Sequence, residues 1–329
     1  MARFKSFVLI LALAAPASFA SQRLLYLEAQ AVAGYSFHDN EVVWYSMDQM
    51  DAMQKPSIGF DFLHRLSGES GDWGLLAIQV RLAYDSTYKY NIEPQLYNAY
   101  LKLKPSFGDV WLGHNKPAFG LASNLDNHGT LLQPLSMYGF GYDRDWGAGY
   151  YRDLDWGNAA LSATLGSGMP FIAKGNYLLS GRLAKGDLNR DNYTAGLSAS
   201  YGRTLETMGY HLDWMFDEPR RMAMLGTDGT LYSNRWENRI ELLVNITDHG
   251  EMLPSYMDTV FTIFYRSTVN AMDENRLKLE LQYIYQHQSN EDHHFLSTGF
   301  SYQIIPDLTT RLYLIESSIV AQLYWYHNL

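Results

Sequence analysis

Residues 75–85 read LLAIQVRLAYD, and the side chains of this stretch alternate between two faces of an extended chain. The apolar face carries Leu76, Ile78, Val80, Leu82 and Tyr84, and the other face carries Ala77, Gln79, Arg81, Ala83 and Asp85. An α-helix would spread these polar residues around its circumference, whereas a β-strand places them on one side. The stretch therefore predicts a strand with one apolar face and one polar face.

Two further stretches repeat this alternation. In residues 96–104, Tyr97, Ala99, Leu101 and Leu103 oppose Asn98, Tyr100, Lys102 and Lys104. In residues 277–288, Leu277, Leu279, Leu281, Tyr283 and Tyr285 oppose Lys278, Glu280, Gln282, Gln286 and Gln288. A soluble exported β-sandwich alternates in the same way and is the alternative fold. Strands of about ten to twelve residues, charges in mid-strand and aromatic residues at strand ends favour a transmembrane antiparallel β-barrel.

The number of strands follows from the turn signals. Short turns fit residues 67–74, 105–109, 153–157 and 305–308, and longer connections fit 38–56, 86–94, 115–144 and 247–257. We predict an all-β barrel of sixteen strands, with residues 319–329 as the closing strand. Residues 204–236 could hold two or three strands, so fourteen or eighteen strands stay open. An even total is required if both ends of the chain lie in the periplasm.

The first twenty residues predict a secretory signal peptide. Arg3 and Lys5 precede a short apolar core at 7–15, and Ser18-Phe19-Ala20 is a small-x-small cleavage site. We expect a signal peptide at 1–20, a barrel at 21–329, and export to the outer membrane of a Gram-negative bacterium. The chain has no cysteine, which excludes disulfides and thiolate metal sites. Its formal charge of −10 disfavours nucleic acid as a partner.

Residues 108–121, GDVWLGHNKPAFGL, resemble the strand and the start of the long loop in the phosphate-selective porin O/P type family. Residues 144–151, 158–166 and 299–308 are similar to other strands of such porins. The resemblance implies a sixteen-stranded porin, commonly a homotrimer, with a loop folded into the lumen. The chain is acidic and has no comparable run of Arg and Lys, so we do not extend phosphate selectivity to it.

The candidate site is therefore the constriction of a pore. Residues 115–144 form the longest connection and would narrow the lumen by folding inward. Opposed acids and bases at a constriction create a field that orders dipolar solutes, and rings of charge set ion preference. The candidate residues are Lys116, Asp126, Asp143 and Arg144 in this loop and Arg81, Lys102 and Lys104 from the polar faces. We expect passive diffusion of small hydrophilic solutes and contact with lipopolysaccharide, without a cofactor or metal.

One motif supports an enzyme instead. His287-Gln-Ser289-Asn290 matches the His-x-Ser-Asn of outer-membrane phospholipase A and of a lipid A deacylase, in which a Ser–His pair faces lipid. A third residue should orient the histidine. The next strand offers Leu296, Thr298, Phe300 and Tyr302, none of which is acidic or an amide. A barrel hydrolase using His287 and Ser289 is thus the alternative, and ordinary turn residues are the simpler explanation. The neighbouring His293 and His294 lack a fixed metal-ligand spacing.

Overall fold

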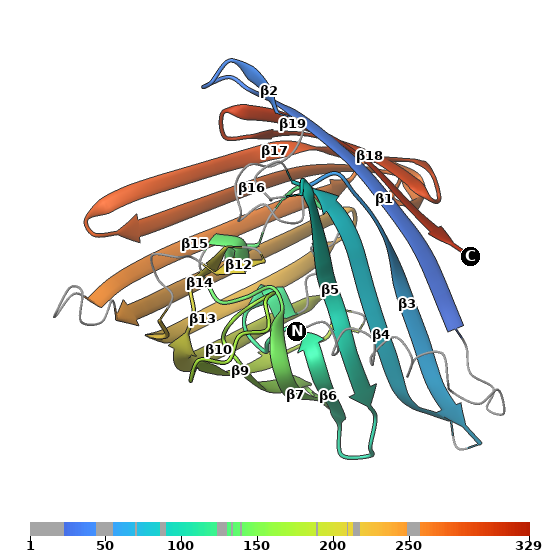
Figure 1. Cartoon of the computed structure of the whole chain (residues 1–329), viewed down its shortest axis with the longest axis vertical. Helices are drawn as coiled ribbons and strands as arrows, with labels where there is room; N and C mark the ends of the chain where they lie inside the picture. Colours follow the sequence, from blue (N-terminus) through green and yellow to red (C-terminus); the bar gives the residue numbers. More distant parts are fainter. Residues whose placement is uncertain are drawn as a thin grey trace.

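Sixteen antiparallel strands form a closed barrel in the computed structural model (Figure 1). The structure describes residues 23–43, 55–69, 71–85, 90–123, 130–132, 134–138, 140–188, 190–208, 210–212, 218–248 and 257–329. The expected signal peptide lies outside these ranges. In order around the barrel, the strands are β1 (Arg23–Ser36), β3 (Ser57–Gly68), β4 (Gly71–Tyr84), β5 (Ile92–Leu103), β6 (Asp109–Asn115), β7 (Asp145–Leu154), β8 (Gly157–Thr164), β9 (Tyr177–Lys185), β10 (Tyr193–Thr204), β13 (Arg220–Ser233), β14 (Trp236–Asp248), β15 (Met257–Asn270), β16 (Leu277–Gln288), β17 (Glu291–Ile305), β18 (Leu308–Ile315) and β19 (Ser318–Asn328).

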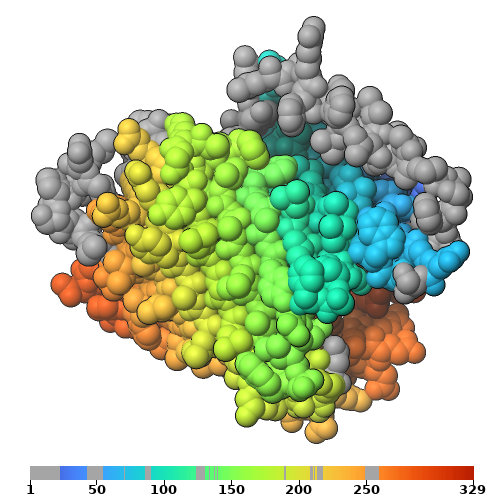
Figure 2. All heavy atoms as spheres, turned by 90° about the horizontal axis from the view of Figure 1, so that it is seen from below, coloured from blue at the N-terminus to red at the C-terminus, as the bar shows by residue number. Residues whose placement is uncertain are grey.

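The first and last strands close the barrel. β1 pairs with β19 from Tyr26↔Asn328 to Ser36↔Ser318, and β1 also pairs with β3 on its other side. Every other barrel strand pairs with its neighbours in the chain, so colours follow the sequence across the outer surface in Figure 2. The short β2 (Glu41–Val43) pairs only with the end of β1. Among the described residues, no helix is long and apolar enough to cross a membrane.

The prediction of sixteen strands is confirmed, and the ambiguity over residues 204–236 is resolved. This stretch contributes one barrel strand, β13. It also holds β11 (Thr207–Met208) and β12 (His211–Leu212), which pair only with each other and form no part of the barrel. Fourteen and eighteen strands were therefore wrong alternatives. With an even number, the start of β1 and the end of β19 lie at the same rim.

The two faces of the strands separate as the alternation predicts. On β4 the side chain of Arg81 is 2% exposed, whereas its neighbour Leu82 is 50% exposed. On β16 Gln282 and Ile284 are buried, whereas Leu279 and Leu281 are exposed. Polar residues thus line the interior of the barrel, and large apolar residues cover its outside. This is the arrangement of a barrel with lipid outside and water within.

Tyr97 is an exception, because we expected it on the apolar face with Ala99 and Leu101. The β4–β5 register shifts from Gln79↔Asn98 to Val80↔Leu96, so Tyr97 is the extra residue of β5 at this point. Such a bulge places two residues opposite one and redirects the extra side chain. Tyr97 is fully buried, and its ring centroid lies 4.2 Å from the guanidinium carbon of Arg144.

The connections differ between the two ends of the barrel. At the end where β1 begins, here called the turn rim, the connections are short, and one contains the 3₁₀ turn η5 (Asp273–Asn275). At the opposite end, the loop rim, residues 116–144 form the longest connection, here called the internal loop. Residues 289–290 and 316–317 are two-residue turns at this loop rim. The asymmetry agrees with the pattern of turns and loops in the sequence.

The internal loop folds into the barrel and is hydrogen-bonded to its wall (Figure 1). It contains two 3₁₀ turns, η2 (Leu121–Ser123) and η3 (Leu135–Tyr138). Three of its backbone N–H groups donate to side chains on three different strands. These bonds join Ala118 to Ser162 Oγ on β8 at 2.9 Å, Gly120 to Ser198 Oγ on β10 at 3.0 Å, and Leu121 to Glu241 Oε1 on β14 at 3.1 Å.

Apolar contacts hold the same loop on two further parts of the wall. One cluster joins loop residues Phe119, Leu121, Leu135 and Phe140 to Leu178, Met222, Met224, Leu243, Phe264 and Ile284 of β9 and β13 to β16. A second cluster joins Leu131 and Leu132 to Val32 of β1 and Tyr313 of β18. Because these strands lie on different sides of the barrel, the internal loop crosses the interior.

The end of the internal loop is tied to other loops by Tyr142. Its hydroxyl lies 2.6 Å from the carbonyl oxygen of Leu205 and 2.9 Å from that of Gly166. Burial raises the pKa of the Tyr142 hydroxyl well above its usual value, so this hydroxyl stays protonated and donates to the carbonyls. The internal loop is therefore fixed at both ends as well as in its middle.

We predict that Gly120→Ala loosens the internal loop. Gly120 has φ +55°, and an added Cβ would lie 1.8 Å from Glu241 Oε1, which anchors Leu121. Gly175, with φ +79° and no atom within 4 Å of an added Cβ, is the matched control. Each alanine costs about 1–2 kcal/mol of backbone strain, but only Gly120→Ala displaces the anchor. Phe140 of the internal loop packs in the same cluster as Phe119 and Leu121. Chymotrypsin should cleave after Phe140 faster in Gly120→Ala than in Gly175→Ala; equal rates would contradict the anchor.

Candidate functional site in the barrel interior

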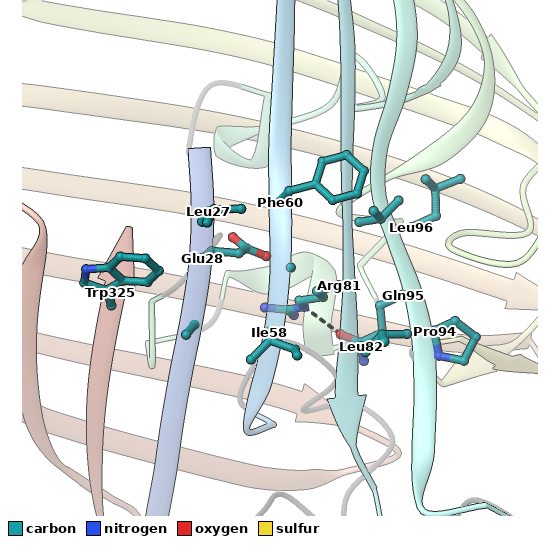
Figure 3. A pocket seen from close by; sticks show the side chains of 13 residues that line it. Leu27, Glu28, Ile58, Phe60, Arg81, Leu82, Pro94, Gln95, Leu96 and Trp325 are labelled. Atoms are coloured by element: carbon teal, nitrogen blue, oxygen red, sulfur yellow. Dashed lines mark hydrogen bonds between the residues drawn. The ribbon is translucent and has the colours of Figure 1, made fainter. Parts of the chain in front are cut away.

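Buried ionic side chains gather on the inner wall at β4 and β5. Arg81 Nε donates to Gln95 Oε1 at 2.7 Å, and Gln95 Nε2 donates to Glu93 Oε2 at 2.7 Å (Figure 3 shows the first bond). Lys55 pairs with Asp85 and lies 3.4 Å from the same Glu93 oxygen. Burial of charge is tolerated when each ion has partners of this kind. The network fixes the positions of Arg81 and Glu93.

A second chain of hydrogen bonds links the end of the internal loop to β1. Arg144 Nε donates to Asn98 Oδ1 at 2.9 Å, and its Nη1 lies 3.0 Å from Asp143 Oδ2. Asn98 Nδ2 then donates to Gln79 Oε1 at 2.8 Å, and Gln79 Nε2 donates to Glu28 Oε2 at 3.4 Å. The last residues of the internal loop therefore share one polar network with the wall.

The far wall also carries buried ions. Arg182 on β9 binds Asp228 on β13 through two nitrogens, at 2.9 and 2.6 Å. Glu241 is 4% exposed and lies opposite Asp228 in the β13–β14 register. β4 is third and β14 eleventh in the order around the barrel, eight of sixteen strands apart. The guanidinium of Arg81 and the carboxylate of Glu241 therefore stand on opposite walls.

Two further clusters of polar side chains lie on the inner wall formed by β15 to β19. Glu280 of β16 pairs with Arg266 of β15 and accepts a hydrogen bond from Tyr313 of β18. Arg311 Nη1 donates to Gln322 Oε1 at 2.7 Å, and its guanidinium lies 5.4 Å from the centre of the Tyr324 ring. β15, β16, β18 and β19 thus each present a hydrogen-bonding side chain inward, which suits contact with water and polar solutes.

The structure brings together three of the residues that the sequence singled out. Arg81 of β4 and the last two residues of the internal loop, Asp143 and Arg144, are all buried on the β4–β5 side of the interior. Lys116 begins the internal loop and lines a cavity beneath it. Asp126 lies outside the described residues.

The other two lysines lie nearer the turn rim. Lys102 faces inward near the end of β5, where Nζ lies 3.5 Å from Asp109 Oδ2. Lys104 lies in the turn after β5 and is exposed. The charge of Lys102 therefore lies inside the barrel, where it can influence ions in the lumen, whereas Lys104 lies at the turn rim.

Sequence reasoning missed several interior ions. Arg182 and Glu241 sit at inward positions of β9 and β14, where the same alternation that identified Arg81 would have found them. Lys55 precedes β3, and no periodic pattern marks a side chain in a connection. Only the folded chain shows that Lys55 reaches Asp85 and Glu93.

The outer wall differs sharply from the interior. An apolar groove of about 760 Å³ lies over β1, β3, β4, β5 and the end of β19 (Figure 3). Its apolar side chains are Leu27, Ala29, Ile58, Phe60, Val80, Leu82, Pro94, Leu96 and Trp325. β4 thus contributes Leu82 to this outer groove and Arg81 to the inner network, which is the two-faced pattern of residues 75–85.

The His-x-Ser-Asn motif forms the tight turn between β16 and β17. Ser289 and Asn290 are the two turn residues, with φ 52° and 67°. His287 Nδ1 lies 2.7 Å from Asp292 Oδ1, which also accepts from Tyr285 Oη at 2.8 Å. The expectation that the next strand offers no acid to orient His287 is wrong. The turn is only two residues long, so Asp292 belongs to β17 and pairs with His287. Within the described residues, no cluster of His, Asp and Glu is arranged to hold a metal ion.

Comparison with known proteins gives matches to solved structures only. No protein-family model matches the chain, and no curated protein matches it in sequence. A trimer form of OmpT, an outer membrane protein of Vibrio cholerae, is 11% identical with a TM-score of 0.64, covering 94% of this chain and 100% of that one. An anion-selective porin from Comamonas acidovorans is 10% identical with a TM-score of 0.63, over 94% and 100%.

The outer membrane channel DcaP of Acinetobacter baumannii is 13% identical with a TM-score of 0.61, covering 93% of this chain and 97% of that one. Such identities show the fold alone. No match supports the phosphate-selective porin O/P type family in particular. The chain has the sixteen-stranded barrel fold of bacterial outer-membrane porins.

Proposed function

We propose that the chain is an outer-membrane channel for passive diffusion of small hydrophilic solutes. The observation that carries the proposal is the internal loop, anchored by Ser162, Ser198 and Glu241 inside a barrel with a polar wall. A polar interior is costly in a dry barrel and is stable when water fills it. A loop held inside the barrel narrows its interior, as solute selection by size requires.

The constriction that we propose lies between the internal loop and the β4–β5 wall. Arg81 borders it from the wall, and Lys116, Asp143 and Arg144 border it from the internal loop. The buried cations are matched by carboxylates such as Asp143 and Asp228, which supports a channel without strong anion selectivity.

The location follows from the same features. We propose that residues 1–20 are removed during export and that the barrel resides in the outer membrane of a Gram-negative bacterium. Its apolar outer wall would contact lipid, with lipopolysaccharide in the leaflet at the loop rim. We further propose a homotrimer, which the trimer form of the Vibrio cholerae protein supports by analogy of fold.

A hydrolase is the second candidate, because His287 and Asp292 form the hydrogen-bonded pair that a catalytic serine would need. We propose that this pair is not catalytic. Ser289 occupies a left-handed turn position rather than a strand position beside His287. The Asp292 oxygen is also shared with Tyr285, which fits a hydrogen-bonded cluster on the outer surface.

Charge reversal at Lys102 should change ion selectivity. In water, a unit charge ~8 Å from a permeating monovalent ion changes the energy of that ion by ~0.5 kcal/mol. Lys102→Glu changes the charge by two units, and screening at physiological salt reduces the resulting energy change to ~0.4 kcal/mol for each ion. The change favours cations and disfavours anions by this amount, so planar-bilayer recordings should show the cation-to-anion permeability ratio rise about three- to fourfold in Lys102→Glu. Lys104→Glu, two residues further in the exposed turn, is the control and should change the ratio less. Stable insertion with no conductance would refute the channel.

Ser289→Ala should leave the protein unchanged in every assay. We expect no hydrolysis of acyl esters by the purified protein in detergent, and equal conductance with and without the hydroxyl. His287→Ala serves as a second variant, because it removes the contact with Asp292. Ester hydrolysis that disappears in both variants would establish the hydrolase instead.

The folded protein should fractionate with the outer membrane and assemble as a homotrimer. Gel electrophoresis should show faster migration before boiling than after it, because a closed barrel resists detergent. Chemical cross-linking in membranes should stop at a trimer band. A water-soluble mature protein would contradict the membrane location, and cross-linking that yields monomer alone would contradict the trimer.

A further inference from the structure

Two adjoining cavities lie beneath the internal loop, on its side toward the turn rim. One has a volume of about 300 Å³ and the other about 350 Å³, and both are lined by Tyr151, Asn158 and Arg182. Pro117 and Ala118 of the internal loop bound the first cavity, and Leu121 bounds the second. These volumes lie at the lower end of the range of about 300–1,000 Å³ for small-molecule pockets. A solute that passes the loop would meet these cavities next.

The three shared residues are held in place by hydrogen bonds. Arg182 is fixed by its two bonds to Asp228, and its Nη1 lies 3.3 Å from Asn158 Oδ1. Tyr151 Oη donates to Asp153 Oδ1 at 2.7 Å. A ligand would therefore find a phenol, an amide and a guanidinium that are already oriented, which reduces the entropy lost on binding.

Most of the charges that line the cavities are paired with an opposite charge, and the lining carboxylate of Asp153 accepts a hydrogen bond from Tyr151. Four such pairs are Lys102–Asp109 at 3.5 Å, Arg182–Asp228 at 2.6 Å, Arg190–Asp187 at 3.6 Å, and Arg239–Glu237. Paired ions keep further donors and lone pairs for hydrogen bonding but offer little net charge. The lining therefore favours a neutral ligand with many hydroxyl groups over an ion.

Aromatic side chains also line the cavities and could contact the apolar parts of a ligand. Tyr100 and Trp111 line the first cavity together with Tyr151. The indole of Trp111 covers Gly149 so closely that an added Cβ there would lie 2.3 Å from its Nε1. Because Gly149 has no Cβ, the indole of Trp111 packs directly on the backbone of β7, which holds the ring in place. Flat aromatic surfaces pack against the C–H faces of a saturated ring.

We propose that these cavities bind a neutral polyhydroxylated ring, such as a mono- or disaccharide, during its passage. The aromatic side chains contact its C–H faces, and Tyr151, Asn158 and Arg182 bind its hydroxyl groups. This assignment rests on the proposed channel function and adds its solute class. It differs from general diffusion because transport through a binding site saturates with solute concentration.

The test is a titration of channel conductance with glucose and maltose in planar bilayers. Conductance should fall saturably, whereas polyethylene glycol of equal size should lower it without saturation. Asn158→Leu and Tyr151→Phe should each raise the half-saturating concentration about three- to tenfold, as expected for one lost hydrogen bond. Tyr326→Phe is the matched control, because it removes a similar Tyr–Asp bond, to Asp61 at 2.8 Å, elsewhere on the inner wall.

A second readout separates failure of the site from failure of the channel. Sugar should change tryptophan fluorescence of the purified protein, and this change should disappear in Trp111→Phe. A conducting channel with neither saturation nor a fluorescence change overturns the saccharide site and leaves the channel intact. Tighter binding of glucuronate than of glucose overturns the neutral ligand class. A fluorescence change without conductance would retain the site and refute the channel.

Discussion

Closure of the sheet by hydrogen bonds between β1 and β19 is the constraint on which the rest of the structure depends. An open edge would leave backbone N–H and C=O groups unpaired, which is too costly in a lipid environment. Closure gives the barrel a definite interior, and the alternation of side chains then assigns every second residue to it. Arg81 and Leu82, adjacent in β4, consequently lie on opposite sides of one wall.

The internal loop depends on this closed wall. Its backbone N–H groups need acceptors inside the barrel, and Ser162, Ser198 and Glu241 supply them from three separate strands. Its apolar residues are covered by inward side chains such as Met224 and Phe264, which interrupt an otherwise polar wall. The wall thus offers the internal loop both hydrogen-bond acceptors and an apolar patch, and the loop covers the two cavities that Arg182 lines.

Pairing of ions is the common feature of the interior. Arg182 with Asp228, Lys55 with Asp85, and Arg144 with Asp143 each bury a cation beside a carboxylate. Such pairs contribute little net stability after desolvation, but they hold the side chains in one geometry. A neutral, rigid and hydrogen-bonding lining suits uncharged polar solutes better than phosphate, in agreement with the absence of a run of Arg and Lys in the sequence.

The sequence by itself determined the barrel, its sixteen strands within a narrow range, and the inward position of Arg81 and Lys102, because a period of two is a local property of the chain. Only the tertiary structure decided the bulge at Tyr97, the place of Lys55 in the ionic network, and Asp292 as the partner of His287. Each of these depends on register or on a loop contact between residues distant in sequence or across a turn. Local periodicity carries no information about such contacts, since the closed wall and the path of the internal loop bring the side chains together.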